Sequence, residues 1–134
     1  MKRYVLDSFA VLAYLYNEDG AHKVKGVLVQ ALNDKAEIFI TAVNWAEVAY
    51  ISKRKSGVAG WQAAASSLTR LPIEIVPADI ELANIASEFK YKYKLSLADA
   101  FAAALSKSKK AELLTGDPEF KQVEKEIGFN WILD

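Results

Sequence analysis

The chain has 134 residues, of which 52% are apolar and 25% charged, and its 17 basic residues balance 17 acidic ones. These values predict one globular domain over residues 1–134 and exclude a disordered chain. The absence of cysteine and the single histidine, His22, exclude thiol catalysis, thiolate metal sites and mechanisms that need paired imidazoles, so any chemistry must rest on carboxylates.

The first residues resemble the start of a signal peptide, because Lys2 and Arg3 precede an apolar stretch. Asp7 interrupts that stretch, and no small-residue cleavage site follows it. No segment reaches the roughly 18 apolar residues that a membrane span requires. We therefore expect a cytoplasmic protein.

Short apolar runs alternate with longer helical patterns along the chain. In chain order, the runs at 4–6, 38–40, 73–76, 112–114 and 131–133 predict strands, and the patterns at 8–16, 21–33, 42–54, 58–70, 79–92, 97–108 and 118–127 predict helices. Runs this apolar are typical of strands buried under helices on both faces. The alternation predicts a three-layer α/β/α sandwich with a mostly parallel sheet of about five strands.

Acidic residues follow several of the expected strands. Asp7 comes directly after the first strand, and Asp117 comes shortly after the fourth. Glu47 lies in the helix that follows the second strand, and Asp99 is the only charged residue in the apolar stretch 97–105. Because ligands bind at the carboxyl ends of parallel strands, we expect these side chains to meet at one end of the sheet.

Each of these carboxylates also has a purely structural interpretation. Asp7 and Asp117 are suited to cap the helices that follow them, and Ser96 with Asp99 forms a capping-box pattern. Glu47 lies in a helix interior, where the structural alternative is a solvated stripe between two buried faces. Both interpretations stay open for each residue taken singly.

The four carboxylates taken together favour a metal site. No Lys or Arg adjacent in the sequence neutralises them. Like charges a few ångströms apart repel and raise one another's pKa, and a hard divalent cation bound through oxygen is the usual remedy where His and Cys ligands are missing. Mg²⁺ or Mn²⁺ is the expected ion, and one or two such ions activate water for attack on a phosphodiester.

Four short segments carry these acidic residues. They are Val5-Leu6-Asp7-Ser8, Asn44-Trp45-Ala46-Glu47-Val48, Leu95-Ser96-Leu97-Ala98-Asp99-Ala100 and Leu114-Thr115-Gly116-Asp117-Pro118-Glu119-Phe120. Together they resemble the acidic motifs of PIN-domain ribonucleases, in the family's order and across the whole chain. The closest likeness is to the stand-alone VapC-type toxins of prokaryotic toxin-antitoxin pairs. It implies a PIN-like fold, Mg²⁺- or Mn²⁺-dependent endonucleolytic cleavage of RNA, homodimerisation and inhibition by a small antitoxin protein.

The resemblance implies that Asp7, Glu47, Asp99 and Asp117 are the catalytic and metal-binding residues. Asp7 and Asp99 are expected to bind the ion directly. Glu47 and Asp117 are expected to act partly through water, because Mg²⁺ retains several of its own waters.

Three hydroxyl residues are candidates for supporting roles. Ser8 and Thr115 are expected to orient the ligands or contact phosphate, with an ordinary turn or cap hydroxyl as the alternative. The helix N-termini at Ser8 and Ser96 are expected to orient the scissile phosphate.

RNA binding by a neutral chain requires local basic stretches, and these occur at residues 53–55, 90–94 and 107–110. Their structural alternative is a solvated face or a partner of a helix C-terminus. The best candidate alternates ammonium groups with aromatic rings, which suits the phosphates and unstacked bases of single-stranded RNA. It consists of Lys90, Tyr91, Lys92, Tyr93 and Lys94.

Several large apolar residues exceed what one face of each helix needs, namely Trp45, Tyr50, Ile51, Trp61 and Phe89. Core packing is the expected explanation. The alternative is an exposed groove for a second copy or for an amphipathic helix of the antitoxin.

Other functional classes fit the sequence less well. A non-catalytic PIN-like RNA-binding or scaffold module would be expected to lack some of the acidic residues. A response regulator or phosphatase would need a second Asp close to the first strand, and Ser8-Phe9 provides none. A structural ribosome-associated protein would be expected to carry excess basic charge.

Overall fold

A single five-stranded sheet organises the protein, whose computed structural model describes residues 1–133. All neighbouring strands are parallel, in the order β3-β2-β1-β4-β5. The strands are β1 (Lys2–Leu6), β2 (Ala36–Thr41), β3 (Ile73–Val76), β4 (Glu112–Thr115) and β5 (Phe129–Trp131). The chain therefore begins in the middle of the sheet, and the carboxyl ends of all five strands lie at one end of it.

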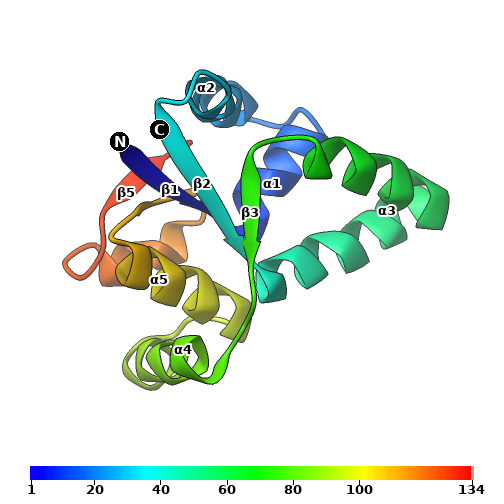
Figure 1. Cartoon of the computed structure of the whole chain (residues 1–134). Coiled ribbons are helices and arrows are strands. Elements are labelled where there is room, and N and C mark those ends of the chain that lie inside the picture. Colours follow the sequence, from blue (N-terminus) through cyan, green and yellow to red (C-terminus); the bar gives the residue numbers. More distant parts are fainter. Residues whose placement is uncertain (134) are drawn as a thin grey trace.

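Helices cover both faces of this sheet (Figure 1). They are α1 (Ser8–Leu15), α2 (Ala21–Leu32), α3 (Ala42–Thr69), α4 (Ile80–Lys92) and α5 (Leu97–Lys109), and the short 3-10 helix η1 (Pro118–Val123) follows β4. Among residues 1–133, no helix is long and apolar enough to cross a bilayer. The predicted three-layer α/β/α sandwich with a parallel sheet is confirmed.

Alternating side chains of the central strands divide the apolar core into two parts. Tyr4 and Leu6 of β1 pack with the residues of α1, α2 and α3, while Val5 packs on the opposite face with those of α4 and α5. Ile38 and Phe39 of β2 repeat the alternation. Because a shift of one residue would turn every side chain to the wrong face, this pattern sets the register that brings the strand ends into line.

Helix α3 is bent sharply at Gly57, whose φ of 75° and ψ of 173° lie in a region that residues with a Cβ rarely adopt. The two helices predicted at 42–54 and 58–70 are the two arms of this bent helix. The arms contact each other through Trp45 and Trp61, whose ring centroids are 5.3 Å apart in an edge-on arrangement. Figure 1 shows that the first arm leaves the sheet near the ends of β2 and β3 and runs outward.

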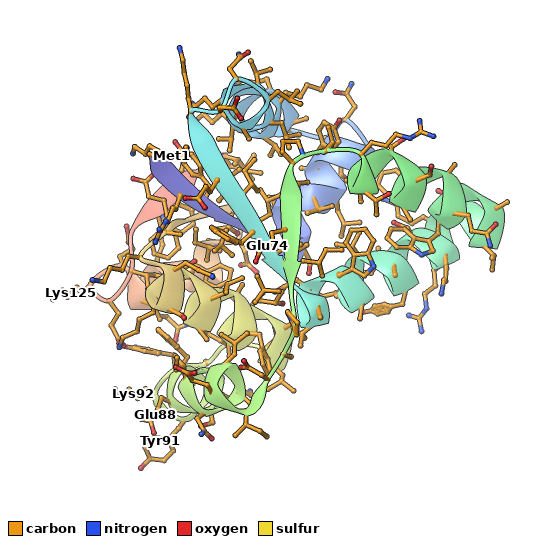
Figure 2. The ribbon with its side chains drawn as sticks, viewed as in Figure 1. Met1, Glu74, Glu88, Tyr91, Lys92 and Lys125 are labelled. Atoms are coloured by element: carbon orange, nitrogen blue, oxygen red, sulfur yellow. The ribbon has the colours of Figure 1, made fainter. Side chains whose placement is uncertain are left out.

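The edge strand β3 has the predicted bounds, 73–76, but not the predicted burial. Both Glu74, which is labelled in Figure 2, and Ile75 are exposed. The expectation that this run is buried under helices on both faces is therefore wrong. An edge strand has a neighbour on one side only, and here both cores centre on the middle strands.

The C-terminal part of the chain also differs from its prediction. β5 ends at Trp131 and not at 133, and Ile132, read as part of a strand because it is apolar, is buried just beyond the strand. Of the helix predicted at 118–127, only the 3-10 turns up to Val123 form. The amides of Glu126 and Ile127 both donate to the carbonyl of Val123, which turns the chain back towards β5.

Candidate metal centre

Asp7 joins the end of β1 to the start of α1. One of its carboxylate oxygens accepts a hydrogen bond from the amide of Ala10 at 2.8 Å, which caps α1, and the other accepts one from the hydroxyl of Thr115. The side chain is only 1% exposed. The capping interpretation of Asp7 is thus correct, and it leaves the carboxylate buried at the end of the sheet.

Thr115, the last residue of β4, connects two of the predicted site residues. Its hydroxyl donates to Asp7 and accepts the amide of Asp117 at 3.0 Å. Because Thr115 is fully buried, it is placed to orient Asp7 and Asp117 and not to contact a phosphate. Asp117 in turn caps η1 by accepting the amide of Glu119 at 2.9 Å.

Asp99 lies in the first turn of α5, with its side chain half-buried. Its amide donates to the hydroxyl of Ser96 at 3.1 Å, so the capping pattern expected from the sequence is present. Ser96 itself is exposed at the start of the helix. The N-terminus of α5 therefore presents Asp99 at the same end of the sheet as Asp117.

Three carboxylates converge at this end of the sheet. Oxygen atoms of Asp99, Asp117 and Glu119 all lie within 4.8 Å of one another. Asp7 and Glu47 are not in this trio. Glu119 was missed as a site residue in the sequence, although it belongs to the segment that carries Asp117. The sequence does hold a signal for Glu119, because it lies two residues after a capping Asp. Its backbone amide donates to the Asp117 carboxylate, and this places Glu119 beside it.

Asp7 and Glu47 interact electrostatically with carboxylates of the trio. Burial, with smaller contributions from the charges of Asp99 and Asp117, raises the pKa of Asp7 to about 8, although the hydrogen bonds from Thr115 and Ala10 act in the opposite direction. Burial also raises the pKa of Asp99 to about 6, with added contributions from the charges of Asp117, Glu47 and Glu119. All five carboxylates thus belong to one interacting group.

Asn44 connects the segments that carry Asp7 and Asp99. Its side-chain amide donates to the Ser8 hydroxyl at 3.2 Å and to the carbonyl of Ala98 at 3.3 Å. Ser8 is buried and its hydroxyl donates to the carbonyl of Asn44, so it supports the backbone beside Asp7 and is not exposed to phosphate. Thr41 caps α3 and donates to the Asn44 side chain, which completes a fully buried polar network.

Within residues 1–133, no ion pair involves a carboxylate of the trio. The ion pairs join Lys2 to Glu112, Arg3 to Glu37 and Lys107 to Glu126. A cluster of hard anionic oxygens without a cationic partner has the donor set that Mg²⁺ or Mn²⁺ prefers. The residues present therefore fit a divalent cation.

The basic stretches occupy different places around the fold. Residues 107–110 end α5 at the opposite end of that helix from Asp99. Figure 2 shows Tyr91 and Lys92 on the outer side of α4, away from the carboxyl ends of β2 and β3. Tyr93 is committed to other contacts, since its hydroxyl donates to Glu126 and its ring lies against Phe89. Tyr91, Lys92 and Tyr93 are thus not brought to the carboxylates, whereas Lys94 lies beside η1, where its backbone amide donates to the side chain of Gln122 at 3.0 Å.

The large apolar residues are mostly part of the core, as expected. Trp61 and Phe89 are buried, and Trp45 packs partly buried against the same core as Trp61. Ile51 is half-buried, and Tyr50 is 45% exposed.

The chain is similar to proteins of known family and structure. Residues 4–126 match the family model of the PIN domain. The DNA-bound VapBC2 structure from Rickettsia felis has a chain that matches with a TM-score of 0.76 at 16% identity, covering 96% of this chain and 97% of that chain. DNA-bound VapBC from Salmonella typhimurium matches with a TM-score of 0.77 at 14% identity, covering 98% and 99%.

A third similar structure is VapC20 from Mycobacterium tuberculosis, described as a toxin that cleaves the sarcin-ricin loop, with a TM-score of 0.69, 17% identity and coverage of 90% and 94%. At these identities the structures show likeness of fold. A comparison with curated proteins finds no significant match. Since the family model spans nearly the whole sequence, this chain belongs to the PIN domain family.

Proposed function

We propose that this protein is a divalent-metal-dependent endoribonuclease, the toxin of a VapBC-type toxin-antitoxin pair. The observation that carries the proposal is the convergence of Asp99, Asp117 and Glu119 within 4.8 Å in a chain of the PIN domain family. Similar folds occur in structures described as VapBC complexes and in a VapC that cleaves the sarcin-ricin loop. These similarities support RNA as substrate and a small antitoxin as partner, and the proposal also includes homodimerisation and action in the cytoplasm.

The proposed metal ligands are Asp99, Asp117 and Glu119, with Asp7 and Glu47 completing the anionic site. Mg²⁺ or Mn²⁺, when bound, lowers the pKa of water and offsets the negative charge of the phosphodiester. Oxygen ligands alone suit either ion.

The remaining groups of the chain hold this arrangement in place. Thr115 orients the Asp7 carboxylate and the backbone of Asp117 at once. The amide of Asn44 keeps the start of α1 against the start of α5. The free amides at the start of α5, beside Ser96, offer partial positive charge to a phosphate oxygen.

The experiment that tests the function measures cleavage of single-stranded RNA with Mg²⁺ or Mn²⁺ and with a chelator. We expect cleavage only with the ion, and a loss of several orders of magnitude in Asp99→Asn and Asp117→Asn. Glu88→Gln is the matched control, because it removes a carboxylate that is exposed on α4 (Figure 2). Cleavage that survives chelation unchanged contradicts the mechanism, and RNA binding without any cleavage indicates a non-catalytic PIN module.

A further inference from the structure

The first arm of α3 carries an exposed face that begins at the candidate metal centre. At about 100° per residue, Glu47, Tyr50 and Arg54 lie within about 60° of one another around the helix axis. At about 1.5 Å per residue, Tyr50 lies about 4.5 Å and Arg54 about 10.5 Å beyond Glu47 along the arm. This face therefore leads from an acidic site residue outward to a cation.

Tyr50 and Arg54 form a paired aromatic and cationic surface. Tyr50 is 45% exposed, and the guanidinium carbon of Arg54 lies 5.2 Å from the centre of its ring. Arg54 is exposed and forms no ion pair within residues 1–133. The ring and the planar guanidinium thus stay available to a ligand that offers both negative charge and flat aromatic groups.

We propose that this Tyr50–Arg54 face binds single-stranded RNA on one side of the phosphodiester that is cleaved. The inference rests on the proposed function and adds a substrate-binding surface to it. Arg54 contacts a backbone phosphate, and Tyr50 stacks on an unpaired base. A single strand is required, because the bases of a duplex are stacked on each other and do not offer their faces to a side chain.

Charge and continuity favour RNA over a protein partner on this face. The chain has no net charge, so a polyanion must be held by local cations placed beside the site. The carboxylates that bind the ion repel phosphate when the ion is absent, and a cation about 10.5 Å along the same helix face provides an anchor outside that repulsion. Tyrosine and arginine are also common at protein interfaces, so the continuity of this face with Glu47 and the charge of Arg54 are what favour RNA over a protein partner.

The test compares Arg54→Ala with Lys53→Ala, which removes the same charge from the same arm. Lys53 lies about 100° around the helix from Arg54 and about 120° from Glu47, so its charge points away from the phosphate contact proposed for Arg54, although it is only about 60° from Tyr50. Binding is measured by fluorescence anisotropy of a labelled single-stranded RNA in a chelator, which prevents turnover. We expect Arg54→Ala to weaken binding about fivefold and to reduce the slope of log affinity against log salt by about 0.7, with little change in Lys53→Ala.

Tyr50→Ala tests stacking and Tyr50→Phe provides its rescue. We expect Tyr50→Ala to weaken binding on the order of tenfold, while Tyr50→Phe keeps most of the affinity because its ring still stacks. Both side chains are exposed, so thermal melting is expected to show folded variants. Equal losses in Arg54→Ala and Lys53→Ala, or no RNA binding by the unmodified protein, would overturn the proposal.

Steady-state cleavage then separates this inference from the proposed function. We expect KM for RNA to rise in Arg54→Ala and Tyr50→Ala while kcat stays close to its original value. If this face binds RNA selectively but no metal-dependent cleavage occurs, the proposed nuclease activity is wrong and the proposed RNA-binding face stands. If both variants cleave RNA normally with unchanged KM, the proposed RNA-binding face is wrong and the proposed nuclease activity stands. The same conclusion follows if the variants change the oligomeric state on size-exclusion chromatography without changing the affinity for RNA.

Discussion

Replacing Asp7 with Asn is expected to change how the stability of the metal-free protein depends on pH. Burial raises the pKa of Asp7 from an ordinary value of 3.8 to about 8 in the folded protein. The folded state then holds the proton more tightly than the unfolded chain, so stability is greatest below about pH 4 and falls as the pH rises towards 8. Asp7→Asn removes this titration and retains an oxygen that can accept the amide of Ala10.

The pKa values set the size of the effect. At about 1.4 kcal/mol per pKa unit, Asp7 lowers the free energy of unfolding by up to about 4 kcal/mol between pH 4 and pH 7. That is a large share of the roughly 5–15 kcal/mol that stabilises a typical domain. Asp99, whose pKa is raised to about 6, acts in the same direction below that pH, so the range from pH 6 to 8 isolates Asp7.

Urea unfolding followed by circular dichroism, in a chelator, measures these profiles. We expect the unmodified protein to lose stability between pH 6 and 8, and Asp7→Asn to lose little. Asp19→Asn, in an exposed turn, is the matched control and should follow the unmodified protein. Saturating Mn²⁺ should reverse the slope, because the ion competes with protons for the carboxylates. Parallel profiles for the unmodified protein and Asp7→Asn would refute the reasoning.

Three further predictions concern the arrangement of the site. Asp99→Asn should preserve or raise stability in a chelator, because it relieves repulsion between carboxylates, and it should reduce the rise in Tm caused by Mn²⁺. Ser96→Ala should lose about 1 kcal/mol of stability and keep that rise in Tm. Equal behaviour of the two variants would contradict a ligand role for Asp99. Asn44→Ala should lose about 2 kcal/mol in urea unfolding, because buried partners lose their hydrogen bonds, and a neutral result would exclude the connecting role. Gly116→Ala should lose about 1–3 kcal/mol, because its Cβ would lie 2.4 Å from Cε1 of Phe9; Phe9→Leu should recover part of the loss in a double-mutant cycle.

The fold was predictable where local pattern and tertiary environment agree. The apolar runs of β1, β2 and β4 are flanked by helices on both faces, and the helical patterns on either side of Gly57 match the two arms of α3. At the two edges of the sheet, the burial expected for β3 and the bounds expected for β5 were wrong. There, Glu74 is exposed in β3, and Ile132 is buried without being in a strand, so apolar character and strand formation are no longer linked.

Asp7, Asp99 and Asp117 were recognisable because each directly follows a strand or begins a helix. The positioning of Asp7 by Thr115 was not recognisable, because it joins residues that are 108 positions apart. The place of Glu47 was only partly predictable: its helix could be read from the pattern, but its electrostatic contact with Asp99 depends on how α3 packs beside α5.

Capping and metal binding are not competing roles in this site, although the sequence presents them as alternatives. The Asp117 oxygen that caps η1 accepts a hydrogen bond from the amide of Glu119. This bond holds the backbone of Glu119 beside the Asp117 carboxylate. A side chain two residues beyond the cap is thereby carried into the cluster. A short capped turn after a parallel strand thus delivers two carboxylates to one place. The same capping that makes Asp117 look merely structural in the sequence is what recruits Glu119, the residue that the sequence analysis missed.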